Sequence, residues 1–216
     1  MPNHNGYRYV IWDWNGTLLD DLSLCVDVIN GMLRKRRMPT VTREEYLAVF
    51  GFPVRRYYQA LGFDFSRESF EALSHEFIAG YEAGRRGCAL HPEVRTTLER
   101  IAAADQRQAL LSASAQDSLR DAVRTFELDA FFDQVAGLDN IYAHSKVELG
   151  CELVSSLPCA PSEAVLVGDT LHDAEVAQAM GTGCVLVAHG HQSRARLHQH
   201  GATRVVDSLR ELADFV

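Results

Sequence analysis

The sequence predicts an α/β fold in which a parallel sheet, covered by helices on both faces, carries an inserted α-helical domain. From Leu90 onward, short apolar segments alternate with amphipathic helical segments, whereas residues 18–86 show helical periodicity and no convincing strand. The chain has 216 residues, 47% of them hydrophobic and 23% charged. At roughly 100–200 residues per domain, this length suits one large domain with a sizeable insert.

The first strand is predicted at Tyr7–Trp12. Its apolar and aromatic residues end abruptly at Asp13, and the chain then turns through Asn15-Gly16. A buried strand that ends in this way brings a carboxylate to its C-terminal tip, where open α/β sheets bind ligands. The alternative is an ordinary strand and turn with an incidental acid, and the rest of the chain argues against it.

The next segment predicts a small bundle of helices. Two stripes of apolar residues at three- and four-residue spacing each mark one buried helix face. Thr42 and Glu45 form a capping box that starts a further helix, which stops at Gly51-Phe52-Pro53. The stripes comprise Leu22, Cys25, Val26, Ile29, Met32 and Leu33, and then Phe70, Leu73, Phe77, Ile78 and Tyr81.

The remainder of the chain alternates between strands and helices. Ser114 with Asp117, and Ser145 with Glu148, are each expected to open a helix, and Gly181 is expected to end another. Such alternation implies right-handed crossovers and a parallel sheet. The candidate strands after the first are Gln108–Leu111, Gln134–Gly137, Ala164–Val167, Cys184–Val187 and Arg204–Val206.

Composition argues against several classes of function. The net charge of −8 argues against general nucleic-acid binding, and no apolar run approaches the ~18 residues of a membrane span. Residues 1–5 show no secretory signal, and the five cysteines form no Cys-x-x-Cys pair that would indicate zinc. We therefore expect a cytoplasmic protein with a small-molecule partner and no nucleic-acid or membrane partner. The sequence does not indicate the oligomeric state.

Polar residues at the predicted strand ends indicate one site. Asp13, Ser112 and Asp169 follow three of the strands, and the carboxyl ends of parallel strands share one edge of a sheet. Asp173 lies one helical turn beyond Asp169, and Lys146 lies in the first turn of a helix. These residues are therefore expected to converge.

Carboxylates brought together repel one another unless a cation or proton joins them. A cluster with only oxygen ligands favours a hard ion, Mg²⁺ above all. With Lys146, the Ser112 hydroxyl and backbone N–H groups as further partners, the edge suits an anionic phosphoryl group. Asp13 could then act as a nucleophile that forms an aspartyl-phosphate.

Four segments of the chain resemble the four motifs of the haloacid dehalogenase (HAD) superfamily, in the family's order. They are Asp13-Trp14-Asn15-Gly16-Thr17, Ser112, Lys146 and Gly168-Asp169-Thr170-Leu171-His172-Asp173. Steps of 99, 34 and 23 residues separate Asp13, Ser112, Lys146 and Asp169. The chain is most similar to the phosphoglycolate-phosphatase-like branch with a first-type cap. This resemblance implies a Rossmann-like core domain at 1–18 and 87–216 and a helical cap domain at 19–86.

The resemblance also implies roles for the acidic residues. Asp13 would be the catalytic nucleophile and a metal ligand, and Asn15 would offer its backbone carbonyl to Mg²⁺. Asp169 would supply a further carboxylate. Asp173 would lie close by and hold a metal-bound water or Lys146.

For the substrate, the resemblance implies that Ser112, the amide of Ala113 and Lys146 bind the phosphoryl oxygens. The insert would select the leaving group. Arg55 or Arg56 could pair with a small carboxylate, as 2-phosphoglycolate would require, although both also suit an exposed helix face. The expected function is a Mg²⁺-dependent phosphatase acting on a small phosphorylated metabolite.

Asn15 departs from the family pattern, in which most phosphatases have an aspartate two residues after the nucleophile. An amide cannot take or release a proton near neutral pH, and general acid–base catalysis typically contributes about 10²–10⁴-fold. The enzyme could be slow or restricted to good leaving groups, or another group could carry the proton, with His172 as first candidate. An engineered substitution is a third possibility.

Alternative functions stay open at this point. A catalytically weakened homologue could serve as a phosphate-ligand binding or regulatory protein. A dehalogenase would attack carbon with Asp13 but would have no use for the Gly-Asp-x-x-x-Asp signature, and a phosphoacceptor receiver domain would lack the insert. His189 and His191 have no nearby partner in the sequence and do not predict a metal site.

Overall fold

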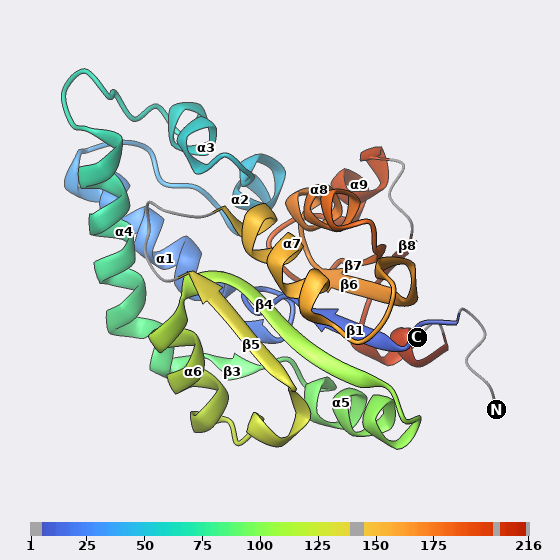
Figure 1. Cartoon of the computed structure of the whole chain (residues 1–216). Helices are drawn as coiled ribbons and strands as arrows, with labels where there is room; N and C mark the ends of the chain where they lie inside the picture. Colours follow the sequence, from blue (N-terminus) through green and yellow to red (C-terminus); the bar gives the residue numbers. More distant parts are fainter. Residues whose placement is uncertain (1–5, 139–144, 201–203, 215–216) are drawn as a thin grey trace.

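The computed structural model describes residues 6–138, 145–200 and 204–214. Its centre is a six-stranded sheet with the order β5-β4-β1-β6-β7-β8 (Figure 1), in which every pair of neighbours is parallel. All six expected strands are present, which confirms the predicted parallel sheet. The strands are β1 (Tyr9–Trp12), β4 (Arg107–Ala115), β5 (Gln134–Leu138), β6 (Ala164–Gly168), β7 (Gly183–Val187) and β8 (Arg204–Val206).

Helices cover both faces of the sheet, as the apolar runs require. Alternate side chains of β1 enter different cores: Val10 and Trp12 pack on one face, Tyr9 and Ile11 on the other. Helices α5 and α6 cover the first face, and α7, α8 and α9 cover the second (Figure 1). Their bounds are α5 (Val94–Ala103), α6 (Gln116–Thr125), α7 (Lys146–Ser156), α8 (Leu171–Met180) and α9 (Arg194–Leu197).

Strand register aligns the strand ends that carry the candidate site. Trp12, the last residue of β1, lies level with Leu110 of β4 and Val167 of β6. The amide of the next residue, Asp13, donates a hydrogen bond of 2.8 Å to the carbonyl of Val167. Residues just beyond these strands therefore meet at one edge.

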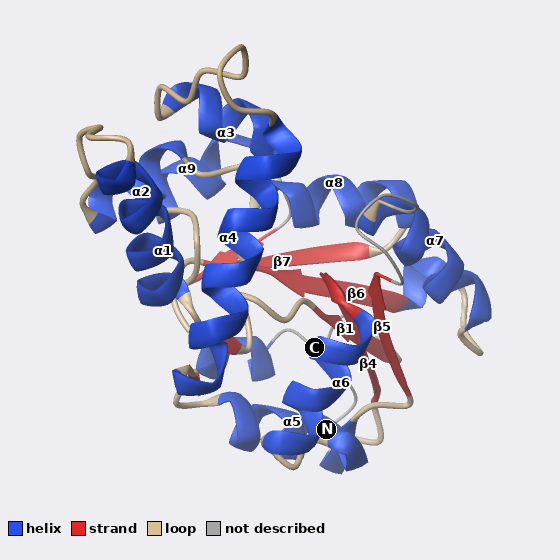
Figure 2. Cartoon of the chain, turned by 90° about the vertical axis from the view of Figure 1, so that its left-hand side faces the viewer, coloured by secondary structure: helices blue, strands red, loops and turns tan. Residues whose placement is uncertain are grey.

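The helical insert, by which we mean α1–α4, has a core of its own. Its buried members come from both predicted stripes and include Leu22, Ile29 and Leu73. The capping box of Thr42 and Glu45 is present at the start of α2. Figure 2 shows these helices standing beside the sheet rather than within its two helical layers. They are α1 (Leu22–Lys35), α2 (Arg43–Val49), α3 (Val54–Ala60) and α4 (Phe70–Gly84). The domain limits given above stay a prediction.

Two short strands at the ends of the insert were not expected. β2 (Leu19–Asp20) and β3 (Ala89–Leu90) pair in antiparallel fashion. Two residues are too few to produce a periodic pattern, so only the contact between distant segments reveals them. Short 3₁₀ helices complete the structure: η1 (Arg85–Gly87), η2 (Asp129–Phe131), η3 (Pro161–Glu163), η4 (His198–His200) and η5 (Leu209–Asp214).

The prediction that Ser114 and Asp117 open a helix is wrong. β4 continues through Ser114 to Ala115, and α6 begins after Ala115 without a side-chain cap. The Ser114 hydroxyl instead donates a 2.7 Å hydrogen bond to Oδ1 of Asn15. By contrast, the capping box of Ser145 and Glu148 is present, and α8 ends at Gly181 in the left-handed conformation.

Among the described helices, none combines the length and the apolar character that crossing a bilayer would require.

Candidate active site

Three carboxylates meet at the carboxyl edge of the sheet. Asp13 follows β1, Asp169 follows β6 and Asp173 lies in the first turn of α8. One oxygen from each lies within 4.8 Å of those of the other two, and all three side chains are buried. The structure therefore brings together the acids that the strand ends predicted.

Lys146 supplies a single positive charge to this cluster. Its ammonium donates hydrogen bonds to the carboxylate of Asp13 and to Oδ1 of Asp173, the latter at 2.6 Å. Burial raises the pKa of Asp13 to about 6, although Lys146 opposes the rise. Burial raises the pKa of Asp169 to about 8, and His191 opposes that rise only in part. Burial acts on Asp173 too, but Lys146 outweighs it and the pKa of Asp173 is lowered.

The charge balance at this edge fits a divalent cation. One ammonium faces three buried carboxylates, and the pKa of both Asp13 and Asp169 stays raised because Lys146 and His191 offset the effect of burial only in part. Oxygen donors of this kind are the ligands that Mg²⁺ prefers. Mg²⁺ therefore suits the residues present.

Asp173 fixes the geometry of the loop that carries Asp169. Its second oxygen accepts from the amides of Thr170 (2.9 Å) and Asp169 (3.2 Å), and from the Thr170 hydroxyl (2.7 Å). The same carboxylate thus binds Lys146 with one oxygen and caps α8 with the other, so both oxygens already accept hydrogen bonds.

Asn15 lies in a network that the sequence did not predict. Its amide nitrogen donates hydrogen bonds to Asp21 (2.7 Å) and to the hydroxyl of Tyr81 in α4 (2.6 Å). Its amide oxygen accepts hydrogen bonds from the hydroxyls of Ser114 (2.7 Å) and Ser112 (3.4 Å). Tyr81 in turn donates to Asp21 at 2.8 Å. The sequence showed Asp21 only as an acid before a helix and Tyr81 only as part of an apolar stripe.

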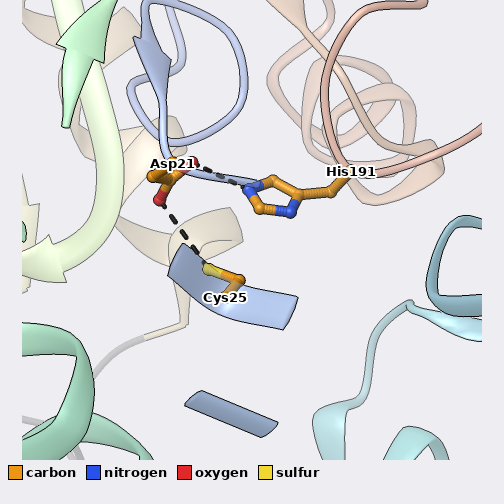
Figure 3. Close-up of side chains that lie close together, drawn as sticks. All are labelled: Asp21, Cys25 and His191. Atoms are coloured by element: carbon orange, nitrogen blue, oxygen red, sulfur yellow. Dashed lines mark hydrogen bonds and ion pairs between the residues drawn. The ribbon is translucent and has the colours of Figure 1, made fainter. Parts of the chain in front are cut away.

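Asp21 also contacts His191 from the loop after β7 (Figure 3). Its carboxylate lies 3.0 Å from Nε2 of His191, and the Cys25 thiol lies 3.9 Å from its other oxygen. The other ring nitrogen of His191 lies 3.0 Å from the Tyr46 hydroxyl. Burial would lower the pKa of His191, but Asp21 outweighs it and the pKa rises to about 9. The group is therefore a buried ion pair, and burial keeps the Cys25 thiol protonated by raising its pKa.

The turn after Asp13 is held from two sides. His91 and His189 stack with ring centroids 3.8 Å apart, and their Nε2 atoms lie 3.1 Å from the carbonyls of Gly16 and Thr17. Gly16 has φ of 73°, and a Cβ there would lie 2.3 Å from Asp169 Oδ2. Glycine is therefore required at this position by both backbone conformation and space.

A cavity of about 510 Å³ opens from the carboxylates into the helical insert. Lys146, Ala113 and Ser114 line it, whereas Ser112 is fully buried and does not. His172 also lines it, stacked on Phe52 with centroids 4.6 Å apart and 2.9 Å from Glu175, but it does not belong to the carboxylate cluster.

The prediction of Arg55 as a substrate-binding residue is not supported by its position. Arg55 is exposed and lies outside the cavity lining. Its guanidinium lies over the rings of Phe65 and Phe70, 4.8 and 4.9 Å from their centroids. These cation–π contacts hold the guanidinium against the two rings.

The structure is an α/β fold whose parallel sheet presents carboxylates and a lysine to a cavity under a helical insert. This arrangement suits hydrolases that act on phosphoryl groups. Residues 10–187 match the family model of haloacid dehalogenase-like hydrolases, so the chain belongs to this family.

Relatives agree with this assignment. The chain is 26% identical to a phosphoglycolate phosphatase of Pseudomonas syringae pv. tomato, covering 95% of this chain and 78% of that one. It is 27% identical to a tyrosine-protein kinase of Mycobacterium tuberculosis, covering 94% and 72%. A haloacid dehalogenase-like hydrolase from Streptococcus pneumoniae has the same fold, with a TM-score of 0.82, 18% identity and coverage of 96% and 97%.

These findings confirm the predicted fold and the predicted class of enzyme, a phosphatase of the haloacid dehalogenase type.

Proposed function

We propose that the protein is a Mg²⁺-dependent phosphatase that hydrolyses a small phosphorylated metabolite through an aspartyl-phosphate on Asp13. The observation that carries this proposal is the junction of three buried carboxylates with Lys146 at the edge of the sheet. Hard oxygen ligands, a fixed ammonium and a cavity in front of them together suit a phosphoryl dianion.

Each residue of the cluster has a distinct task in this proposal. Asp13, Asp169 and the backbone carbonyl of Asn15 would hold Mg²⁺, with Asp173 close by. When bound, Mg²⁺ would neutralise charge on the phosphoryl oxygens, which would otherwise repel an attacking carboxylate. Ala113 and Lys146, with Ser112 behind them, would receive the phosphoryl oxygens.

The reaction then takes two steps. An oxygen of Asp13 attacks phosphorus and forms an O–P bond, while the bond to the leaving oxygen breaks and its electron pair departs with the leaving group. The Thr17 hydroxyl, which donates to Asp13 Oδ2 at 3.0 Å, helps to orient the nucleophile. Water next attacks the aspartyl-phosphate, so that inorganic phosphate is released and the carboxylate is restored.

Hydrolysis of p-nitrophenyl phosphate tests the proposal. Activity should require Mg²⁺, and Asp13→Asn should lower kcat by about 10³-fold or more, because it removes the nucleophile. Asp129→Asn, at an exposed acid on η2, serves as control and should leave the rate unchanged. An acid-quenched reaction should yield a phosphorylated peptide that contains Asp13.

Two results would contradict the proposal. One is phosphate release that survives excess EDTA or the loss of Asp13. The other is chloride release from 2-haloacids without metal, which would point to attack on carbon. Binding of phosphate esters without any turnover would favour a regulatory homologue.

A further inference from the structure

The cavity in front of the carboxylates is strongly aromatic where it enters the insert. Its wall there includes Tyr46, Phe50, Tyr57, Tyr58, Phe70 and Phe77. Phe52 and Ile78 also line it, and their exposed fractions of 41% and 40% are high for large apolar residues. Exposed apolar side chains on a concave wall favour an apolar ligand.

The charges along this wall do not suit a carboxylate-bearing substrate. Glu71 and Glu82 line the cavity, as do His75 and His172, whereas no arginine does so within the described parts of the chain. The Lys146 ammonium is paired with Asp13 and Asp173, and the His191 ring with Asp21. A substrate such as 2-phosphoglycolate would therefore bring its carboxylate toward acids and would meet no arginine, the side chain that pairs with a carboxylate in bidentate fashion, along the described wall.

Asn15 restricts the leaving group in a second, independent way. The side chain at this position cannot give a proton to the departing oxygen, because it is an amide whose hydrogen atoms point to Asp21 and Tyr81. A leaving group that can depart as an anion is therefore favoured. A phenol, with a pKa of about 10, does so far more readily than an alcohol whose pKa lies close to the roughly 15.7 of water.

We infer that the substrate is a phosphate monoester of a phenol, whose aromatic ring occupies the cavity between α2, α3 and α4. This inference rests on the proposed phosphatase function and names its substrate class. Attack by Asp13 breaks the bond from phosphorus to the aryl oxygen, and the phenoxide leaves with the electron pair and takes a proton from water. Hydrolysis of the aspartyl-phosphate completes the reaction, whose sum is aryl phosphate plus water giving phenol plus inorganic phosphate.

Three substrates test separately whether the cavity favours an aromatic ring and whether the reaction favours a leaving group that departs as an anion. Phenyl phosphate has the ring and the good leaving group, benzyl phosphate has the ring on an alcohol, and 2-phosphoglycolate has neither. We expect kcat for phenyl phosphate to exceed that for benzyl phosphate by about 10²-fold or more, with similar KM, because general acid catalysis is missing. 2-Phosphoglycolate should have the highest KM. A kcat/KM for 2-phosphoglycolate that equals or exceeds that for phenyl phosphate would overturn the inference but leave the phosphatase in place.

Binding of inert analogues provides a measurement that needs no turnover. Calorimetry with Mg²⁺ present should show benzylphosphonate binding at least about tenfold more tightly than 3-phosphonopropionate, since only the former buries a ring. Equal or reversed affinities would overturn the inference. Tight benzylphosphonate binding without hydrolysis of any ester would instead overturn the proposed function.

A matched pair of variants locates the ring. Ile78→Arg places a cation on the cavity wall, and we expect it to lower kcat/KM for phenyl phosphate by about tenfold and to raise that for 2-phosphoglycolate. Val49→Arg is the control, because Val49 is equally exposed at 39% but lies outside the cavity lining. The control should match the wild type. If Ile78→Arg also left the preference between the two substrates unchanged, the ring would not lie against this wall.

Discussion

Asn15 is held in one orientation by its neighbours. It donates both amide hydrogens to Asp21 and Tyr81, and it accepts from Ser114. An aspartate at this position would bring a carboxylate oxygen to where the amide nitrogen now lies 2.7 Å from Asp21. Two carboxylates at that distance, one buried and one partly buried, cannot both be ionised at low cost. The acid at position 21 therefore favours an amide over a second acid at position 15.

Exchanging the two groups tests this coupling. Asn15→Asp alone should destabilise the protein by about 1–3 kcal/mol near neutral pH, because a partly buried hydrogen bond is replaced by repulsion. Asn15→Asp/Asp21→Asn should recover only part of that loss, since the Tyr81 hydroxyl can reverse its donor and acceptor roles but His191 loses the carboxylate with which it forms a buried ion pair. Urea unfolding at neutral pH measures both effects. A single variant as stable as the wild type would show that the contact does not constrain position 15.

The raised pKa of Asp169 predicts that the Mg²⁺ binding proposed above depends on pH. The pKa of its carboxyl group is raised from 3.8 to about 8 without a cation, so the native state favours the protonated acid. The associated stability is present at low pH and is lost as the pH rises through about 8. Mg²⁺ takes the place of the proton, and the increase in Tm that it causes should therefore grow from about pH 6 to about pH 8.

Thermal unfolding with and without Mg²⁺ checks this expectation across that pH range. Asp169→Asn removes the group with the higher pKa, so the increase in Tm caused by Mg²⁺ should become smaller and should depend less on pH, with Asp13 as the remaining group that titrates, at a pKa of about 6. An equal increase at both ends of the range in the wild type would contradict a coupled proton and metal.

At the scale of elements, local patterns predicted most of the fold. The buried strands β1 and β6 appear in the sequence as continuous apolar runs. The capping boxes at Thr42 and Ser145 depend only on residues three positions apart. Ser114 shows where such reasoning fails. Its local pattern matches a helix start, but its hydroxyl bonds Asn15, which lies 99 residues earlier in the chain.

The candidate site divides in the same way. Asp13, Lys146, Asp169 and Asp173 could be predicted because strand ends and helix starts determine their positions. The contacts of Asn15 with Asp21 and Tyr81, and the aromatic cavity, depend on how the insert packs over the sheet, which no local pattern encodes. The position of Arg55 depends on the same packing, since its guanidinium lies over the rings of Phe65 and Phe70 and not in the cavity lining.

At the scale of the whole molecule, two tyrosines connect the insert to the loops of the sheet. Tyr46 of α2 contacts His191 after β7, and Tyr81 of α4 contacts both Asn15 after β1 and Asp21. Each places a hydroxyl from the insert next to the candidate site. The position of the insert over the carboxylates is therefore linked to the orientation of Asn15.

Tyr81→Phe tests this link. Removing the hydroxyl leaves a hydrogen of Asn15 and part of the Asp21 carboxylate without their partner, and we expect a loss of about 1–3 kcal/mol in the free energy of unfolding. Tyr57→Phe is a matched control in the same insert, because the buried Tyr57 hydroxyl has no hydrogen-bond partner among the described residues. Its removal should be neutral or slightly stabilising, since an unsatisfied buried polar group is lost. Equal unfolding midpoints in urea for the two variants would show that the Tyr81 hydroxyl contributes nothing to the junction. The orientation of Asn15 would then have to depend on its other partners, Asp21, Ser114 and Ser112.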